Sequence, residues 1–281
     1  MVVKIVTDSV SDIPPEIANE LGITIVPLFV HSGTETYHDR IDLTPEEFYN
    51  KLAHSTTLPT TAAPSPGGFA AVYDELAEQT DSILVITLGF GATYGNAVKG
   101  IELMKRKCRL ELVNSQKAIM AQGLVVIAAA KAANVGASLD EAVDLTQHNI
   151  QRVDFRAAFD TLEYLRRGGR IGKAQAFLGS MLKVNPIITI RDGEVCPAAR
   201  LRSRAQAIKY LYDFAMSYSR IEEMAIEEAT TPDEAEMLAD RLSSKFPKER
   251  IYRSKMSPVI VTHTGPRAIA VSVLGDREWP T

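Results

Sequence analysis

The sequence predicts a two-domain α/β protein: an N-terminal domain with a mainly parallel sheet and helices on both faces, and a C-terminal α/β domain with an antiparallel element. Apolar, β-branched runs alternate with capped helical segments through the first half, a pattern typical of an open α/β sheet. Polar or glycine-rich loops follow these runs directly, as they do at the carboxyl ends of parallel strands. In the second half, Asp192-Gly193 stands between two strand-like runs and indicates a hairpin.

The strands and helices of the first half can be assigned in order along the chain. The strand-like runs are short and apolar, and they lie at 2–6, 23–30, 82–88 and 109–113. The helical segments lie at 14–21, 43–49, 69–76 and about 118–133. Gly22 ends the first helix, and Thr44 with Glu47 has the spacing of a capping box for the second. This alternation favours helical crossovers between parallel strands.

The second half begins near Asp154, where the sequence changes character after a helical pattern that runs from about 139 to 165. We therefore expect residues 1–155 to form the N-terminal domain and residues 156–281 the C-terminal domain, with a ligand at the domain junction. Strand-like runs and helices complete the second half, at 187–190, 194–198, about 203–217 and 232–246. The apolar run at 258–260 predicts a buried strand that ends in a polar loop.

Composition excludes several classes of protein. With 281 residues, 46% of them hydrophobic and 23% charged, the chain is long and apolar enough for a substantial core. Its longest apolar run is shorter than the roughly 20 residues that span a bilayer. The first residues enter a strand pattern at once and lack the layout of a signal peptide, so we expect a cytoplasmic location. A net charge of −4 favours no nucleic-acid partner and at most transient membrane contact.

Neither metal nor cofactor is expected from the motifs. Cys108 and Cys196 are isolated, and the five histidines have no metal-ligand spacing. The phosphate-binding lysine motif and the nucleophile elbow of serine hydrolases are also missing from the sequence. The glycine-rich stretch 89–95 resembles a dinucleotide fingerprint, but its spacing is one residue too long. Asn114 also stands where an acidic ribose ligand would be needed.

Several polar residues are candidates for anion binding. His263 lies between Thr262 and Thr264, a group that can hold an anionic head group or form a structural turn. Arg170 follows a pair of glycines, and its guanidinium can clamp a carboxylate or phosphate or lie in a surface turn. Thr93, in the glycine-rich loop, can face a small anion together with backbone amides.

Two further features leave alternatives open. Thr60 and Thr61 precede a helix, where hydroxyls either cap the helix or contact an anion. Asp8 follows the first strand as the nucleophile of aspartyl-phosphate phosphatases does, but Val10 occupies the position of the second aspartate. A helix-entry network around Asp8 is therefore favoured over a phosphatase site.

Charge is unevenly distributed in the second half. Between Arg166 and Lys209 there are ten lysines and arginines and two acidic residues, and an acidic stretch follows from Glu222 to Asp240. The basic segment can bind phosphate or an acidic partner. Alternatively, the two segments form solvated surfaces that partly neutralise each other.

Taken together, five segments resemble the DegV family in order and across essentially the whole chain. They are Thr7-Asp8-Ser9, the stretch Pro59-Thr60-Thr61 with Pro64-Ser65, the glycine loop with Thr93-Tyr94, the stretch Tyr164-Leu165 with Gly168-Gly169-Arg170-Ile171, and Thr262-His263-Thr264-Gly265-Pro266. The resemblance implies a two-domain α/β protein that encloses a long-chain fatty acid. It also implies that the protein is not catalytic alone but is the binding subunit of a bacterial fatty acid kinase, presenting the acid to a separate ATP-binding subunit that makes acyl-phosphate.

The resemblance also implies roles for particular residues. Thr61 and His263 would contact or organise the carboxylate, with Arg170 supporting them and Thr93 and Thr262 as further candidates. The carboxylate needs several hydrogen bonds once it leaves water, whereas the acyl chain needs only an apolar tunnel. The docking surface for the kinase or the transferred phosphate would include Arg200, Arg202 and Arg204.

The chain departs from the usual family pattern at four positions near the expected site. Ala62 and Ala63 replace a serine and a glutamine, and Arg267 replaces a glycine. Gly91 replaces a serine that normally helps to bind the carboxylate, so a backbone amide or water substitutes for it or the head group differs. Arg267 would add charge near the mouth of the site or point into solvent.

Two other function classes compete with a lipid carrier. One is a stand-alone hydrolase or transferase that acts on an acyl or phosphate substrate with Asp8, His263 and a threonine hydroxyl. The other is a regulatory or scaffold protein that works through the basic segment. Acyl length, unsaturation and oligomeric state do not follow from the sequence.

Overall fold

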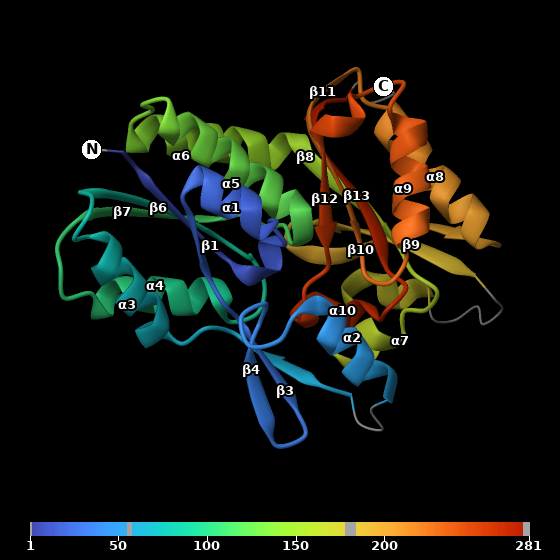
Figure 1. Ribbon diagram of the computed structural model, residues 1–281, viewed down its shortest axis with the longest axis horizontal. Coiled ribbons are helices and arrows are strands. Elements are labelled where there is room, and N and C mark those ends of the chain that lie inside the picture. Colours follow the sequence, from blue (N-terminus) through green and yellow to red (C-terminus); the bar gives the residue numbers. More distant parts are fainter. Residues whose placement is uncertain (1, 55–57, 178–183, 278–281) are drawn as a thin grey trace.

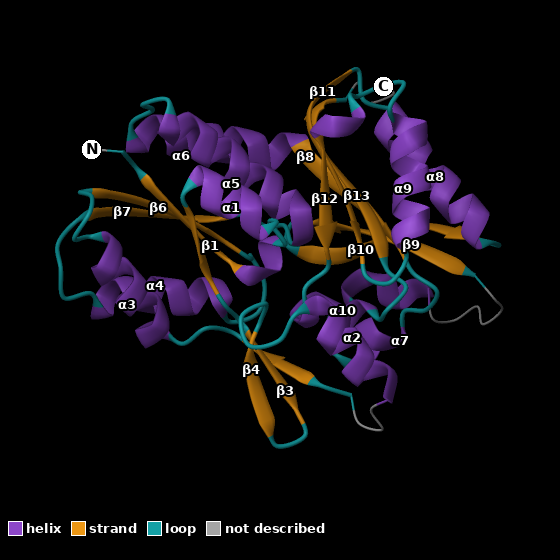
Figure 2. Cartoon of the chain, viewed as in Figure 1, coloured by secondary structure: helices purple, strands orange, loops and turns teal. Residues whose placement is uncertain are grey.

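The computed structural model describes residues 2–54, 58–177 and 184–277 (Figure 1). Two sheets lie beside each other with helices between and around them, and a small third sheet projects at one end (Figure 2). The prediction of an α/β fold, with a parallel sheet in the first half and an antiparallel element in the second, is confirmed. In the described part of the chain, no helix is long and apolar enough to cross a membrane.

The first sheet is parallel throughout and has the strand order β2-β1-β6-β7. Its strands are β1 (Lys4–Asp8), β2 (Ile23–Val26), β6 (Ser82–Thr87) and β7 (Arg109–Asn114). Besides a central helix described below, the helices that pack against it are α1 (Pro15–Leu21), α3 (Pro66–Leu76), α4 (Thr93–Leu103) and α6 (Leu139–Arg152). Because the strands are parallel, the short helix η1 (Ser9–Ser11) after β1 and the glycine-rich loop after β6 leave from the same edge.

The small sheet is antiparallel and projects from the body of the molecule (Figure 1). It contains β3 (Phe29–Ser32), β4 (Glu35–His38) and β5 (Thr60–Ala62), and helix α2 (Pro45–His54) lies between β4 and β5 in the chain. The prediction of one strand over 23–30 is wrong, because the chain leaves the parallel sheet at Pro27 and enters the small sheet at Phe29. Proline has no N–H to donate to a sheet ladder, so it ends the first pairing.

The largest sheet has six strands in the order β10-β9-β8-β13-β11-β12, of which only β11 and β12 pair in parallel. Its strands are β8 (Val153–Ala158), β9 (Asn185–Arg191), β10 (Glu194–Leu201), β11 (Arg220–Glu228), β12 (Ile251–Lys255) and β13 (Ile269–Asp276). Helices α8 (Arg204–Met216) and α9 (Pro232–Leu242) pack on one face. The hairpin is confirmed: Asp192 and Gly193 both have positive φ, 52° and 73°, as a tight turn between β9 and β10 requires.

Four short segments complete the described chain. They are α7 (Glu163–Arg167), α10 (Pro258–Thr264), η2 (Gly172–Phe177) and η3 (Lys248–Arg250). The prediction of a buried strand over 258–260 is wrong, because these residues open α10. The Ser257 side chain caps the helix by accepting a hydrogen bond from the Ile260 N–H, and Pro258 occupies its first turn.

The prediction of a helical pattern from 139 to 165 is also partly wrong. Helix α6 ends at Arg152, and the chain runs on as β8 in the middle of the six-stranded sheet. The charged pair Asp154 and Arg156 gives β8 a polar appearance in the sequence. In the structure the two side chains form a 2.7 Å ion pair, and the Arg156 guanidinium lies 4.6 Å from the centroid of the Phe214 ring.

Helix α5 (Ile119–Asn134) lies between the parallel sheet and the six-stranded sheet. It packs against β1 on one side and against β8, β11 and β13 on the other, and every residue from Ile119 to Ala130 except Ala128 is buried. A helix that is apolar all round requires such surroundings. The largest hydrophobic core therefore contains residues from both halves of the chain. The domain boundary at residue 155 stays a prediction; the described strands of the two smaller sheets come from 4–114, and those of the large sheet from 153–276.

Buried acidic side chains anchor the first turns of α5 and α10. Glu227 on β11 accepts a hydrogen bond from the Met120 N–H at 2.9 Å, and Asp39 accepts one from the Val259 N–H at 3.2 Å. Both carboxylates are at most 1% exposed. A carboxyl oxygen at a helix N-terminus satisfies an otherwise unpaired N–H whether or not the group is ionised.

Asp12 forms the centre of the same buried region. Its carboxylate accepts a hydrogen bond from the Ser257 N–H at 3.1 Å, and its carbonyl accepts one from the Ser254 hydroxyl. The Arg40 guanidinium lies 3.5 Å from the Asp12 carboxylate. Burial raises the pKa of Asp12 to about 8 even though the Arg40 cation lowers it.

The raised pKa of Asp12 predicts that the protein loses stability as the pH rises. Because folding favours the protonated carboxyl, its contribution is complete below the unfolded pKa of about 4 and is lost as the pH rises through about 8. We expect the free energy of unfolding, measured by urea denaturation, to fall by about 2 kcal/mol between pH 6.5 and 8.5. Asp12→Asn keeps an oxygen for the Ser257 N–H and should flatten this profile; an equally steep fall in that variant would contradict the assignment.

Candidate functional site

Thr61 and His263 meet at a contact between β5 and α10. The Thr61 hydroxyl oxygen lies 2.8 Å from Nε2 of His263, although 202 positions separate the two residues in the sequence. Thr61 is held by the β5–β3 ladder, where it pairs with Val30, and His263 lies in the last turn of α10. The threonine and the histidine that the sequence suggested as anion ligands therefore form one polar group.

The His263 imidazole is neutral at physiological pH. Burial is the main cause that lowers its pKa to about 4, and the nearby Arg170 cation contributes to this lowering because two positive charges would repel each other. Its other nitrogen, Nδ1, is buried and has no hydrogen-bond partner among the described residues. A neutral imidazole has one donor and one acceptor nitrogen, so the tautomer of His263 decides whether Nε2 donates to the Thr61 hydroxyl or accepts from it.

Arg170 supplies a positive charge at the same place. It follows α7, and its Nη1 donates a hydrogen bond to the Gly168 carbonyl at 3.0 Å. Its side chain is exposed and forms no ion pair with any acidic residue in the described part of the chain. The guanidinium is therefore available to an anion that approaches His263.

An apolar cavity of about 80 Å³ starts at these two residues. Its walls come from the first residues of α5, from β8 and β9, and from α10, with Ile119, Phe155 and Ile188 among them. His263 and Arg170 are the charged or titratable residues of the lining. The cavity thus combines apolar walls with a polar end, as sites for amphipathic ligands do.

Two further cavities meet the apolar one at His263 and Arg170. The first has a volume of about 330 Å³ and is lined by Thr61, Thr93 and the glycine-rich loop. The second has a volume of about 240 Å³ and is lined by Thr61 and by residues of α7 and α10, including Thr262. His263 and Arg170 therefore stand where the three cavities meet.

The two remaining ligand candidates, Thr93 and Thr262, are both buried, but they differ in what their side chains contact. Thr93, in the first turn of α4, is 2% exposed and lines the 330 Å³ cavity. Thr262 is 5% exposed, and its hydroxyl donates to the Pro258 carbonyl of its own helix at 2.9 Å. The Thr262 proton is thus already used, which leaves its oxygen as an acceptor only.

The three arginines expected at a partner surface have different environments. Arg204 forms a bidentate ion pair with Glu234, with a shortest distance of 2.6 Å. Arg200 donates to the Ala176 carbonyl and lies 4.3 Å from the centroid of the Phe177 ring. Arg202 is exposed, and its guanidinium has no partner among the described residues. Of the three, Arg202 is therefore the one whose charge is open to another molecule.

The Asp8 side chain forms hydrogen bonds inside the fold. Its carboxylate is fully buried and accepts hydrogen bonds from the Val10 N–H at 3.1 Å and the Leu88 N–H at 2.6 Å. It caps η1, as the favoured interpretation of a helix-entry network requires. Burial raises the pKa of Asp8 to about 6.

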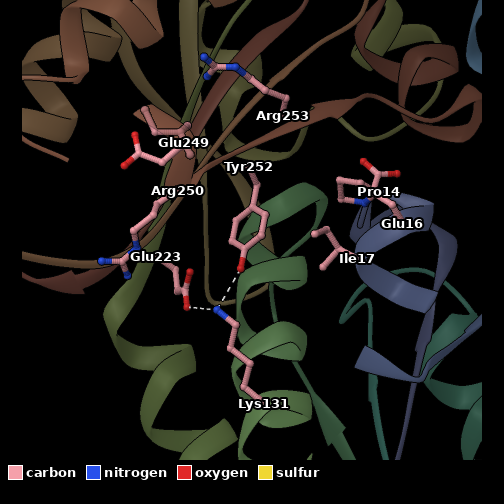
Figure 3. A pocket seen from close by; sticks show the side chains of 10 residues that line it. Pro14, Glu16, Ile17, Lys131, Glu223, Glu249, Arg250, Tyr252 and Arg253 are labelled. Atoms are coloured by element: carbon pink, nitrogen blue, oxygen red, sulfur yellow. Dashed lines mark hydrogen bonds and ion pairs between the residues drawn. The ribbon is translucent and has the colours of Figure 1, made fainter. Parts of the chain in front are cut away.

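A separate groove of about 370 Å³ lies between α1, α5 and β12 (Figure 3). It shares no lining residue with the cavities around His263. Figure 3 shows the ammonium of Lys131 between Glu223 and Tyr252, to which it donates hydrogen bonds of 2.5 and 3.0 Å. This ammonium is already paired inside the groove, so the site around His263, with its unpaired cation and apolar cavity, is the better candidate for a ligand.

Comparison with known proteins identifies the family. A family model described as "Uncharacterised protein, DegV family" matches residues 2–276. The chain belongs to the DegV family. The DegV domain-containing protein of Caldanaerobacter subterraneus is 33% identical over 275 residues, which cover 96% of this chain and 97% of the relative. Protein DegV of Bacillus subtilis is 32% identical over 278 residues, 96% of this chain and 98% of the relative.

Two solved DegV structures share the whole fold. A DegV family protein from Thermus thermophilus, whose structure is described as showing fatty acid binding, superposes with a TM-score of 0.88 at 31% identity, over 98% of this chain and all of that one. DegV from Bacillus subtilis, described as a fatty acid binding protein, superposes with a TM-score of 0.87 at 30% identity, over 98% and 99% of the two chains.

The positions at which this DegV chain departs from the usual pattern can now be placed. Arg267 is exposed and lines none of the cavities around His263; its Nε donates to Asp160 at 2.7 Å, and a second nitrogen lies 3.5 Å from Glu234. Gly91 lines the 330 Å³ cavity with a φ of 76°, and a side chain there would have open space around it. Ala62 and Ala63 line the same cavity.

Some lining residues of this DegV site could not be found from the sequence. Phe90 lines both the apolar cavity and the 330 Å³ cavity, and Ala118 and Ile119 line the apolar cavity at the start of α5. Phe90 carries a weak signal, since it is a large apolar residue between two glycines. Ala118 and Ile119 carry none, because they continue an ordinary apolar run.

The environment of His263 predicts its titration. We expect NMR of the imidazole protons to give a pKa well below 6.5, because burial and the Arg170 cation disfavour the charged ring. Arg170→Gln should raise that pKa by removing the repulsion. A His263 pKa near 6.5 in the wild-type protein would contradict the buried, neutral imidazole.

Proposed function

We propose that this protein binds a long-chain fatty acid in a buried tunnel and presents its carboxylate to a separate ATP-dependent kinase subunit, which converts it to acyl-phosphate. The observation that carries the proposal is the apolar cavity that ends at Thr61, His263 and Arg170. The fatty acid binding described for the Thermus and Bacillus proteins supports it. The ligand would lie between the two predicted domains, and the partner would place the protein in the cytoplasm.

The polar group suits a carboxylate. An ionised carboxylate that leaves water needs several hydrogen bonds or a cation, since its burial otherwise costs several kcal/mol. The Thr61 hydroxyl and the His263 imidazole can supply hydrogen bonds, and Arg170 supplies the charge. Thr93, across the 330 Å³ cavity, is a further ligand in this proposal.

The apolar cavity suits an acyl chain but must widen to hold a long one. Its lining is apolar apart from the residues at the polar end, so no buried polar group would be left unpaired by a hydrocarbon. Its volume of about 80 Å³ is less than a long chain occupies. The proposal therefore requires side chains such as Phe155 and Ile119 to move outward as the acyl chain enters.

The chemistry of phosphoryl transfer would come from the partner. Asp8, the residue that an enzyme of this kind could use as a nucleophile, is fully buried and hydrogen-bonded to two backbone N–H groups. Arg202 offers an exposed, unpaired guanidinium for the partner or the transferred phosphate. Arg200 and Arg204 would shape this surface through their contacts with Ala176 and Glu234.

The first test is native mass spectrometry of the purified protein, followed by denaturing extraction of any bound molecule. We expect one fatty acid per chain, and its mass would give the chain length and unsaturation. A protein that is empty, takes up no added fatty acid and hydrolyses an acyl ester or acyl phosphate by itself would overturn the carrier proposal in favour of a stand-alone enzyme.

Thr61→Ala and His263→Ala should each weaken fatty acid binding by about tenfold, because each removes a hydrogen bond to, or next to, a charged group. The measurement is the dissociation constant of a fluorescent fatty acid. Thr36→Ala is a matched control, because Thr36 forms a 2.8 Å contact with the imidazole of His31 on the exposed small sheet. An equal loss in Thr36→Ala would assign the effect to general destabilisation.

Arg202→Glu should lower the rate of acyl-phosphate formation with the kinase subunit and leave the dissociation constant of the fatty acid unchanged. The physical reason is that Arg202 is exposed and lines none of the cavities around His263. Lys99→Glu, which makes the same charge change at an exposed position of α4, should leave both quantities unchanged. Loss of fatty acid binding in Arg202→Glu would refute this division of roles.

A further inference from the structure

The two short helices next to the site, α7 and α10, pack against each other, and each is followed by a glycine. Gly168 follows α7, and Gly265 follows α10. His263 lies in α10, and Tyr164 lies in α7. The contacts of these four residues determine where the imidazole of the site can lie.

His263 occupies the space that a side chain at position 168 would need. A Cβ atom on Gly168 would lie 2.2 Å from Nδ1 of His263 and 3.0 Å from its Cε1. Atoms that are not bonded to each other separate to about 3.5 Å. The φ of Gly168 is −74°, which any residue adopts easily, so the need for glycine here comes mainly from the imidazole; the Tyr164 carbonyl oxygen, at 3.1 Å, is a lesser contact.

The packing is reciprocal at the other helix. A Cβ atom on Gly265 would lie 2.5 Å from Cδ2 of the Tyr164 ring. Gly265 also has a φ of 80°, which other residues rarely adopt. Each helix therefore places a ring over the glycine that follows the other helix, and the two rings hold α7 and α10 in one relative position.

Gly168 also holds the second polar residue of the site. Its carbonyl accepts the 3.0 Å hydrogen bond from Nη1 of Arg170. One residue thus contacts the imidazole through its α-carbon and the guanidinium through its carbonyl oxygen.

We infer that Gly168 is the positioning residue of the anion site: the absence of a side chain there lets His263 reach Thr61, and its carbonyl directs Arg170 to the same point. A methyl group at position 168 would displace the ring by about 1 Å. A shift of that size breaks the 2.8 Å contact between His263 and Thr61. The inference rests on the proposed function in taking the anion to be a fatty acid carboxylate.

The test compares the affinities of an acid and of an alcohol with the same chain. Palmitic and oleic acid are first tried on the wild-type protein, and the tighter ligand is used with its matching alcohol. We expect Gly168→Ala to bind the acid about tenfold more weakly, because hydrogen bonds to a charged group are lost, and the alcohol within about twofold of wild type. Gly67→Ala, at a helical position where the new methyl group meets nothing closer than 4.0 Å, should change neither affinity.

A double variant separates a positioning role from a merely structural one. With His263→Ala, the ring that excludes a side chain at position 168 is gone, so adding Gly168→Ala should cost no further acid affinity. The melting temperature of the double variant should also exceed that of Gly168→Ala alone, which tests the fit of the ring even if the single variant folds poorly. A wild-type ratio of acid to alcohol affinity in Gly168→Ala, or additive losses in the double variant, would overturn the inference. A wild-type protein that binds neither acid would instead refute the proposed function, and the melting temperatures would still decide the role of Gly168.

Discussion

The burial of α5 on all sides is the constraint on which the rest of the structure depends. Its residues are apolar around the whole helix, so it is stable only with a packed surface on each side. The parallel sheet supplies one surface through β1, and the six-stranded sheet supplies the other through β8, β11 and β13. Since Glu227 also binds the first turn of α5 from the second sheet, the two sheets are held together by apolar contact and by a buried hydrogen bond.

This arrangement creates the candidate site at one end of α5. Ala118 and Ile119, at the start of the helix, form part of the apolar cavity wall. The residues at its polar end come from three separate segments: Thr61 from β5, Arg170 from the turn after α7, and His263 from α10. Asp39 anchors α10 through the Val259 N–H, so the buried carboxylates that join the two halves also hold the helix that carries the imidazole.

Local signals explain which elements were predictable. The parallel strands were clear because they are apolar and bounded by polar loops, and the hairpin because Asp192 and Gly193 suit positive φ. Strand β8 is not predictable because Arg156 pairs with Asp154 and lies over the Phe214 ring, contacts that the sequence does not display. The apolar run before His263 was taken for a strand because seven residues are too few to establish a helical period, although Ser257 and Pro258 do carry helix-start signals.

By itself, the sequence determined the α/β class, several helix starts and the residue types able to bind an anion, because these depend on neighbours a few positions apart. The tertiary structure alone decided that Thr61 and His263 touch, that burial makes His263 neutral and that Arg267 pairs with Asp160 instead of entering the site. It also decided that Gly168 is needed for the space it leaves to the imidazole and not for its backbone conformation. Such properties arise from contacts between distant segments, and their distances follow only from how the two sheets pack around α5.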